Sequence, residues 1–307
     1  MTEAQLPAPG EVFLDHVGWF VEDMGVAAPA FERLGFVLTP YSEHKNATAE
    51  GGRVPSGTAN RCAMLQRGYL EFLVQVRGSK TVLSRQLRDG LMRYEGAHLI
   101  ALATANAEVE HIRLAAAGFD PQPVVKLRRP LALVGGSEAM ASFSVLRTAP
   151  ELMPEGRIQF LTHETPDLVW QPGQLARDNG IEALTGVLIV VADVVEAAGR
   201  YARYCGRPAQ SIGGGGAVIG LDRGRIAIVG PEAKSALFGT AFLSPPPRMA
   251  AIALRSVDLE VTKDHLRRHG IRPVSTAADH LVIGPKDAAG AGLIIHSEGA
   301  DGRLYER

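Results

Sequence analysis

Glu71 is the residue whose surroundings in the sequence most clearly suggest chemistry. It lies in the apolar run 69–73, which reads as a β-strand. Burying an unpaired carboxylate in such a strand is costly, so Glu71 requires a cation, a network of hydrogen-bond donors or a raised pKa. A second polar side chain, Gln159, lies within another apolar strand-like run, 156–162. These two residues make the strands that carry them candidates for a functional site.

The two strands belong to a pattern that occurs four times along the chain. Each copy reads as a strand, a helix that ends at glycine, and about three further strands joined by turns, which makes a βαβββ unit. The first strands fall within residues 13–21, 97–102, 185–191 and 250–254. When His16, His98, Gly186 and Ala251 are taken as equivalent, the helix-ending glycine follows 19 or 20 residues later in every copy. Four such spacings indicate a repeat.

The repeat also predicts the domain organisation. A chain of 307 residues is expected to form about two domains, and four units of about 77 residues would make two pairs. The break between the pairs is expected near residues 171–173, and the prolines at 245–247 separate the third and fourth units. We therefore predict an N-terminal domain over residues 11–176 and a C-terminal domain over residues 177–307.

Repeated βαβββ units resemble the vicinal oxygen chelate superfamily, and the first unit resembles its glyoxalase-like branch. The likeness rests on residues 14–23 (LDHVGWFVED), 57–61 (GTANR) and 68–73 (GYLEFL). The second unit matches reasonably well, and the last two match mainly in spacing. In this superfamily two units pair into a half-open β cup. The resemblance thus implies an α+β fold with two such cups.

The resemblance also implies a metal site, because the superfamily places ligands on the first and last strands of paired units. The corresponding residues are His16, Glu71, His98 and Gln159. Imidazole nitrogen with carboxylate and amide oxygen suits a divalent ion such as Zn, Fe, Mn, Co or Ni, without deciding between them. The alternative is a cup that has kept polar residues but binds no metal.

Glu71 and His163 are the predicted catalytic residues. Strand alternation puts His163 on the same face as Gln159, and the ordinary pKa of histidine suits proton transfer. His163 would contact substrate, act as a general base or replace Gln159 as a ligand, unless it is a turn histidine bonded to its own loop. Candidates for binding a substrate carboxylate or phosphate are Arg61, Arg128, Arg129 and Arg147.

Two further segments bear on the site. The polar segment 41–56 is expected to be a loop that closes over the first cup as a flap. In the second pair, the positions that correspond to the ligands hold Gly186, Ala227, Ala251 and Ile294, none of which binds metal. We therefore expect the second cup to be chemically silent and to serve packing, an oligomer contact or a lid.

Composition excludes several other classes of protein. With 32 basic and 33 acidic residues, the chain lacks the charge expected of a nucleic-acid binder. Its two cysteines, Cys62 and Cys205, cannot form a disulfide framework, and no apolar run approaches the ~20 residues of a membrane span. We expect a cytoplasmic protein that binds a small-molecule substrate, as a monomer or a homodimer.

Three functions fit these observations. The first is a metal-dependent lyase or isomerase that binds vicinal oxygens and stabilises an enediolate or enolate. The second is an extradiol-type dioxygenase, which the resemblance implies because four units in one chain is that family's layout. The third is a non-catalytic binder of the resistance-protein type.

Overall fold

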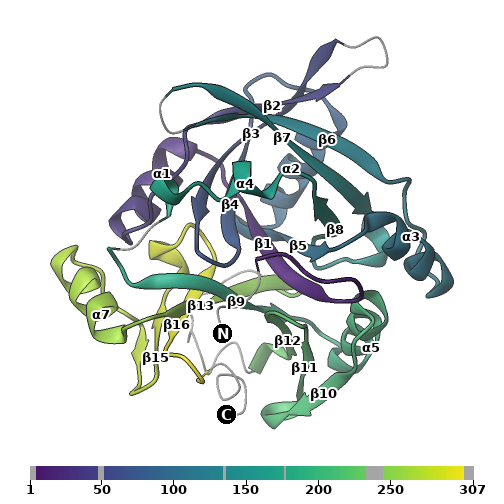
Figure 1. The fold of residues 1–307 in the computed structure, drawn as a ribbon. Coiled ribbons are helices and arrows are strands. Elements are labelled where there is room, and N and C mark those ends of the chain that lie inside the picture. Colours follow the sequence, from purple (N-terminus) through teal and green to yellow (C-terminus); the bar gives the residue numbers. More distant parts are fainter. Residues whose placement is uncertain (1–4, 48–51, 134–135, 176–177, 233–244, 301–307) are drawn as a thin grey trace.

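The computed structural model describes residues 5–47, 52–133, 136–175, 178–232 and 245–300 (Figure 1). The predicted domain division, between residues 176 and 177, lies outside these ranges. None of the helices within them is long and apolar enough to cross a membrane.

The structure confirms the four βαβββ units. The first unit comprises β1 (Val12–Phe20), α1 (Met24–Arg33), β2 (Ser42–Ala47), β3 (Arg53–Met64) and β4 (Tyr69–Gln75). The second comprises β5 (Gly96–Thr104), α3 (Ala107–Ala116), β6 (Val125–Ala132), β7 (Glu138–Arg147) and β8 (Arg157–His163). The third comprises β9 (Ile181–Val190), α5 (Val194–Cys205), β10 (Ala209–Ile212), β11 (Gly216–Gly220) and β12 (Arg225–Val229). The fourth comprises β13 (Arg248–Ser256), α7 (Leu259–Arg268), β14 (Ser275–Thr276), β15 (His280–Ile283) and β16 (Gly292–His296).

Each pair of units forms one eight-stranded sheet with the same topology. The strand order is β2-β3-β4-β1-β5-β8-β7-β6 in the first sheet and β10-β11-β12-β9-β13-β16-β15-β14 in the second. Within a unit, the last strand lies parallel to the first, and the first strands of two units pair antiparallel at the centre of the sheet. The predicted α+β fold with paired units is therefore confirmed.

The described residues of segment 41–56 do not form the predicted loop. Strands β2 and β3 form an antiparallel hairpin that extends the edge of the first sheet. A further helix, α2 (Val82–Arg93), follows β4, and its start is capped by the Thr81 side chain, which accepts a hydrogen bond from the Ser84 amide. Leu83 and Leu87, one turn apart on α2, both face the first sheet's cavity. The cup is therefore closed by a hairpin and a helix.

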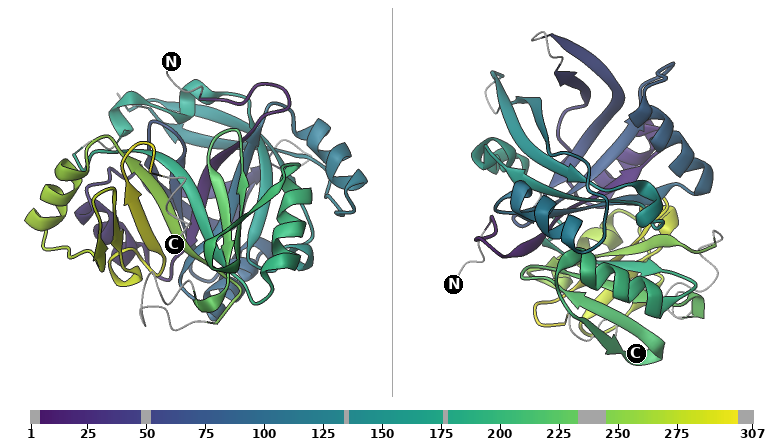
Figure 2. Two further views of the ribbon diagram at one scale, coloured as in Figure 1. Left: turned by 90° about the horizontal axis from the view of Figure 1, so that it is seen from below. Right: turned by 90° about the vertical axis from the view of Figure 1, so that its right-hand side faces the viewer.

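The two sheets are stacked, with the first in the upper half and the second in the lower half of Figure 1 and of the right-hand view of Figure 2. One continuous hydrophobic core joins side chains of both sheets. Backbone hydrogen bonds also cross between the halves, from Leu14 to Arg223 and from Leu184 to Arg67. Helices α1 and α7 lie along one side of the molecule, and α3 and α5 lie along the other (Figure 1).

A buried ion pair also joins the two halves. Glu155, which precedes β8 and is 1% exposed, accepts two hydrogen bonds from the Arg200 guanidinium of α5, at 2.9 and 2.8 Å. Glu196 binds the outer side of the same guanidinium, and the Tyr201 hydroxyl donates to Glu155 at 3.3 Å. The pair fixes α5 against the end of the first sheet.

Substitution of Glu155 by glutamine should lower the free energy of unfolding by roughly 3 kcal/mol, since it leaves Arg200 buried without its main counter-charge. This value is at the low end for a broken buried pair because Glu196 still faces the guanidinium. Chemical denaturation followed by circular dichroism measures the change. The control Glu260→Gln removes an exposed carboxylate paired with Lys263 and should change stability by less than about 1 kcal/mol. Equal losses of stability in the two variants would contradict the stabilising role of the buried Glu155–Arg200 pair.

Candidate functional site

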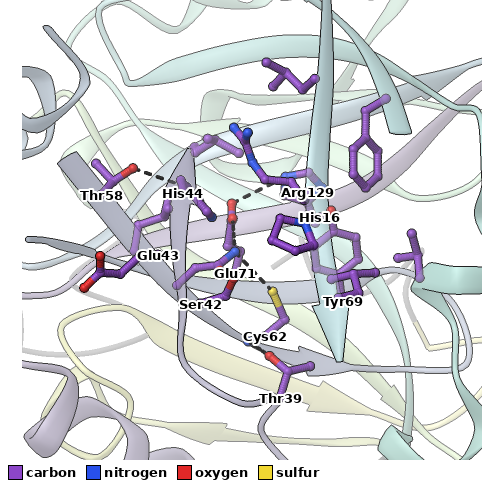
Figure 3. Close-up of a pocket in the computed structure, with 18 of the residues that line it drawn as sticks. His16, Thr39, Ser42, Glu43, His44, Thr58, Cys62, Tyr69, Glu71 and Arg129 are labelled. Carbon is purple, nitrogen blue, oxygen red and sulfur yellow. Dashed lines mark hydrogen bonds and ion pairs between the residues drawn. The ribbon is translucent and has the colours of Figure 1, made fainter. Parts of the chain in front are cut away.

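The first sheet curves around a cavity of about 420 Å³. One part of its wall is apolar and includes Phe20, Leu73, Leu87, Leu99, Val145 and Leu161. The polar part includes His16, His44, Asn60, Glu71, Arg129, Arg147, Arg157 and Gln159. Figure 3 shows the Glu71 carboxylate pointing between His44 and His16, with Arg129 nearby. The cavity therefore combines an apolar wall with ionisable groups.

A β-bulge in β1 shapes the centre of the site. Leu14 pairs with Leu102 and His16 with Ala101, so Asp15 has no partner on β5. Asp15 is completely buried and accepts two hydrogen bonds, from His16 Nδ1 at 2.7 Å and from His163 Nε2 at 2.8 Å. Burial alone would raise the pKa of Asp15, but His163 and His16 together hold it well below its ordinary value. Asp15 is therefore an ionised acceptor.

The Asp15 carboxylate fixes the tautomer of His16. Because an ionised carboxylate only accepts, the hydrogen on His16 lies on Nδ1, which leaves the Nε2 lone pair free in the neutral ring. His16 Nε2 lies 3.7 Å from Glu71 Oε2. The imidazole also stacks on the Tyr69 ring, with 4.3 Å between centroids. His16 is thus a well-oriented base at the edge of the cavity.

Glu71 is held from the neighbouring strand β3. Asn60 Nδ2 donates to Glu71 Oε1 at 2.7 Å, while Glu71 Oε2 is the oxygen nearest His16. Cys62, directly opposite Glu71 in the β3–β4 register, also lines the cavity. Burial and the Glu71 charge raise the pKa of Cys62 well above its ordinary value, so Cys62 remains a thiol and is a poor nucleophile.

The structure does not bring His98 to the cavity. Gly18 pairs with Leu99 and Trp19 with Ala97, so His98 is the extra residue of a second bulge. Its ring stacks between Phe20 and Tyr94, and its Nε2 hydrogen bonds to the Tyr94 carbonyl at 2.8 Å.

The equivalence between His98 and His16 was wrong by one residue. His16 lies two residues before Gly18, which pairs with Glu71; Leu99 lies two residues before Ala101, which pairs with Gln159. Leu99 is therefore the counterpart of His16 in the second unit. It lines the cavity but offers no ligand atom.

Gln159 lines the cavity, but its side-chain oxygen is directed toward the guanidinium of Arg147. Arg147 Nε donates to Gln159 Oε1 at 3.4 Å. Arg147 and Arg157 lie on the same cavity wall, on β7 and β8. Gln159 is therefore placed beside positive charge.

His163 lies one hydrogen bond behind the cavity. Its side chain is fully buried between Phe143 and Trp170, and its Nε2 is bonded to Asp15. Its Nδ1 has no hydrogen-bond partner within the described residues. His163 is connected to His16 only through Asp15. The prediction that His163 contacts a substrate in the cavity therefore does not fit its position.

These residues do not fit the predicted four-ligand metal site. Of the four, His16, Glu71 and Gln159 face the cavity and His98 does not. His44 adds a second imidazole near Glu71, with Nδ1 3.2 Å from Thr58 Oγ1, and burial lowers its pKa to about 4. Even so, the described part of the chain contains no group of three or more His, Cys, Asp or Glu side chains that could hold a metal ion.

Several residues of the site were not identified from the sequence. Asp15 and Asn60 hold the two central groups, and His44 and Arg157 line the cavity. Asp15 directly precedes His16, but only the bulge brings its carboxylate to the ring. Asn60 could have been found from strand alternation, since it lies two residues before Cys62, the residue paired with Glu71.

Among its described residues, the second cup carries no comparable set of side chains at the equivalent positions. The positions that correspond to His16 and Glu71 are Gly186 and Ala227, and in the fourth unit they are Ala251 and Ile294. The concave face around them is a buried apolar cluster. The structure thus places side chains without ligand atoms at these positions, and the chemical silence of the second cup stays a prediction.

The fold resembles solved structures over nearly the whole chain. A hypothetical protein from Staphylococcus aureus matches with a TM-score of 0.63 at 11% identity, over 93% of this chain and 99% of that one. A mutant of 4-hydroxymandelate synthase from Streptomyces coelicolor matches with a TM-score of 0.58 at 14% identity, over 97% of both chains. The Mn(II)-bound glyoxalase from Novosphingobium aromaticivorans matches with a TM-score of 0.53 at 15% identity, over 94% of this chain and 83% of that one.

At these identities the likeness concerns the fold, and two of the three neighbours are enzymes by name. No curated protein matches the chain in sequence. The sequence model of the glyoxalase-like domain, however, matches residues 14–205, which is more than half of the chain. The chain therefore belongs to the glyoxalase-like domain family, within the vicinal oxygen chelate superfamily.

Proposed function

We propose that the N-terminal cup catalyses proton transfer at a carbon next to a carbonyl group, with His16 as the general base. The observation that carries this proposal is the Asp15–His16 pair, whose free Nε2 lies beside Glu71 in a cavity large enough for a small molecule. The reaction class is that of an isomerase or lyase working through an enediolate or enolate.

The chemistry follows from the positions of these groups. The C–H bond next to the carbonyl breaks, its proton goes to His16 Nε2, and its electron pair forms the enolate, with negative charge on oxygen. The imidazolium is stabilised by the Asp15 carboxylate on one side and by Glu71 on the other. Glu71 then takes the proton of the hydroxyl group on the adjacent carbon and passes it to the enolate oxygen. His16 returns its proton to the former carbonyl carbon, which gives the isomer and restores both side chains.

Positive charge is available for the enolate oxygen without a metal ligand set. Arg129 and Arg157 line the cavity, and the Glu71 charge acts on both guanidinium groups. Fixed cations beside a developing oxyanion are an effective form of electrostatic catalysis. In the metal-dependent version predicted from the sequence, a divalent ion would supply this charge, but the donor atoms described above do not form its site.

Replacement of His16 by alanine should lower the rate of proton exchange by about 100-fold or more, since a positioned base contributes roughly 10²–10⁴. The rate would be measured by NMR in D₂O, as the loss of C–H signals from a panel of α-hydroxyaldehydes and α-hydroxyketones. The control His98→Gln keeps a donor for the Tyr94 carbonyl and should leave the rate unchanged. Undiminished exchange in a folded His16→Ala protein, or no exchange with any compound by the unaltered protein, would contradict the proposal.

Asp15→Asn should also slow exchange, because an amide at this position no longer requires the His16 hydrogen to lie on Nδ1. The ¹⁵N chemical shifts of the His16 ring report the tautomer directly. We expect an Nδ1–H tautomer in the unaltered protein and a mixture in the variant. An unchanged tautomer with slowed exchange would show that Asp15 does not act by positioning His16.

Metal dependence is tested separately. We expect protein purified without chelator to hold much less than one equivalent of Zn, Fe, Mn, Co or Ni, since His98 is outside the cavity and Gln159 is bonded to Arg147. Elemental analysis measures this, and exchange should persist after dialysis against EDTA. One tightly bound equivalent that is lost in His16→Ala and Glu71→Ala would restore the predicted metal site.

A further inference from the structure

Three arginines converge on one wall of the cavity. Arg129, Arg147 and Arg157 come from the adjacent strands β6, β7 and β8, and all three line the cavity. Their hydrogen bonds go to neutral acceptors: Arg129 to the Lys45 carbonyl, Arg147 to Gln159 and Arg157 to the Gln86 side chain. Among the described residues, no carboxylate lies within ion-pairing distance of any of these three guanidinium groups.

Arg147 is the least compensated of the three. Burial lowers the pKa of all three side chains, and that of Arg157 falls to about 10. The Glu71 charge acts in the opposite direction on Arg129 and Arg157 but not on Arg147. The positive charge of Arg147 also lowers the pKa of Arg129 and of Arg157. A half-buried cation with like charges on both sides is stabilised most by an anion.

The geometry points to an anion subsite centred on Arg147 and flanked by Arg129 and Arg157, which binds the carboxylate or phosphate group of a small organic substrate. This inference rests on the proposed function, because the subsite shares its cavity with His16 and Glu71. Only the Nε–H of Arg147 has a hydrogen-bond acceptor among the described residues, so its planar guanidinium keeps N–H donors for a bidentate contact with either group.

The rest of the cavity restricts the body of the substrate. Next to Arg147 on the cup face lie Val145 and Leu161, and Leu99 continues this surface toward β1. A substrate anchored at Arg147 would place its carbon skeleton along these side chains and its far end near Glu71. We therefore expect a compact organic anion with an apolar segment, and not a polyanion or a neutral sugar.

The subsite is tested by binding and does not require turnover. Isothermal titration calorimetry would compare phenylacetate, phenyl phosphate and the neutral phenylacetamide on the unaltered chain. We expect at least one anion to bind more tightly than the amide, and Arg147→Gln to weaken that anion about 10- to 100-fold with little effect on the amide. Arg128, which the sequence had also suggested as an anion-binding residue, is exposed and does not line the cavity. The matched control Arg128→Gln therefore removes the same charge outside the site and should leave binding unchanged.

The two anions also identify the group. Preference for phenyl phosphate would indicate a phosphoryl substrate, and preference for phenylacetate would indicate a carboxylate; either supports the subsite. Arg147→Lys keeps the positive charge but cannot make the bidentate contact of a guanidinium. It should recover part of the anion affinity lost in Arg147→Gln, which checks that this loss does not come from misfolding. Equal binding of anion and amide, no anion binding, or equal losses in Arg147→Gln and Arg128→Gln would overturn the proposal. Anion binding without proton exchange would keep the subsite and remove the proposed function instead.

Discussion

The buried carboxylate of Asp15 is the group on which the candidate site depends. A completely buried and ionised carboxylate must receive hydrogen bonds, and both of its oxygens are satisfied by imidazole N–H groups. One of these imidazoles, His163, is itself enclosed by Phe143 and Trp170, so the carboxylate is fixed from behind. The other, His16, then has one orientation and one tautomer. The buried Asp15 carboxylate thus fixes the His16 ring, and with it the direction of the lone pair on Nε2.

The second cup has the same arrangement of strands and bulge with different side chains. Thr185 occupies the bulge of β9 that corresponds to Asp15 in β1, because Gly186 and Leu184 pair with Ala253 and Leu254 on β13. The Thr185 hydroxyl lies 2.7 Å from His296 Nε2, so a buried polar pair is kept at this bulge. The next residue, however, is a glycine, and it presents no ring to the concave face. Both sheets therefore contain a bulge with a buried polar residue, but among the described residues only the first sheet has an imidazole directly after it.

Spacing was sufficient to predict the units, and insufficient to predict which side chains meet. The helix-ending glycines recur at nearly constant intervals because each unit needs one stop between its helix and its next strands. Side-chain direction depends on whether a strand is regular, and a single extra residue reverses it. His98 and Leu99 are adjacent in an apolar strand, so only the bulge decides which of them faces the cavity. The hairpin of β2 and β3 was missed because its polar residues resemble a loop.

The distribution of charge in the first cup follows from the same shift of one residue. With Leu99 in the place of a ligand, the second unit contributes an apolar side chain where a metal site of this design needs a donor. The Gln159 oxygen, which would have been the other donor, accepts from Arg147 instead. A carboxylate facing an open cavity still attracts a positive charge, and Arg129 and Arg157 provide it from β6 and β8. The Glu71 charge favours the charged forms of Arg129 and Arg157, whereas burial is the main influence on Arg147. A buried cation of this kind is stabilised by an anion, which is why the proposed subsite is centred on Arg147.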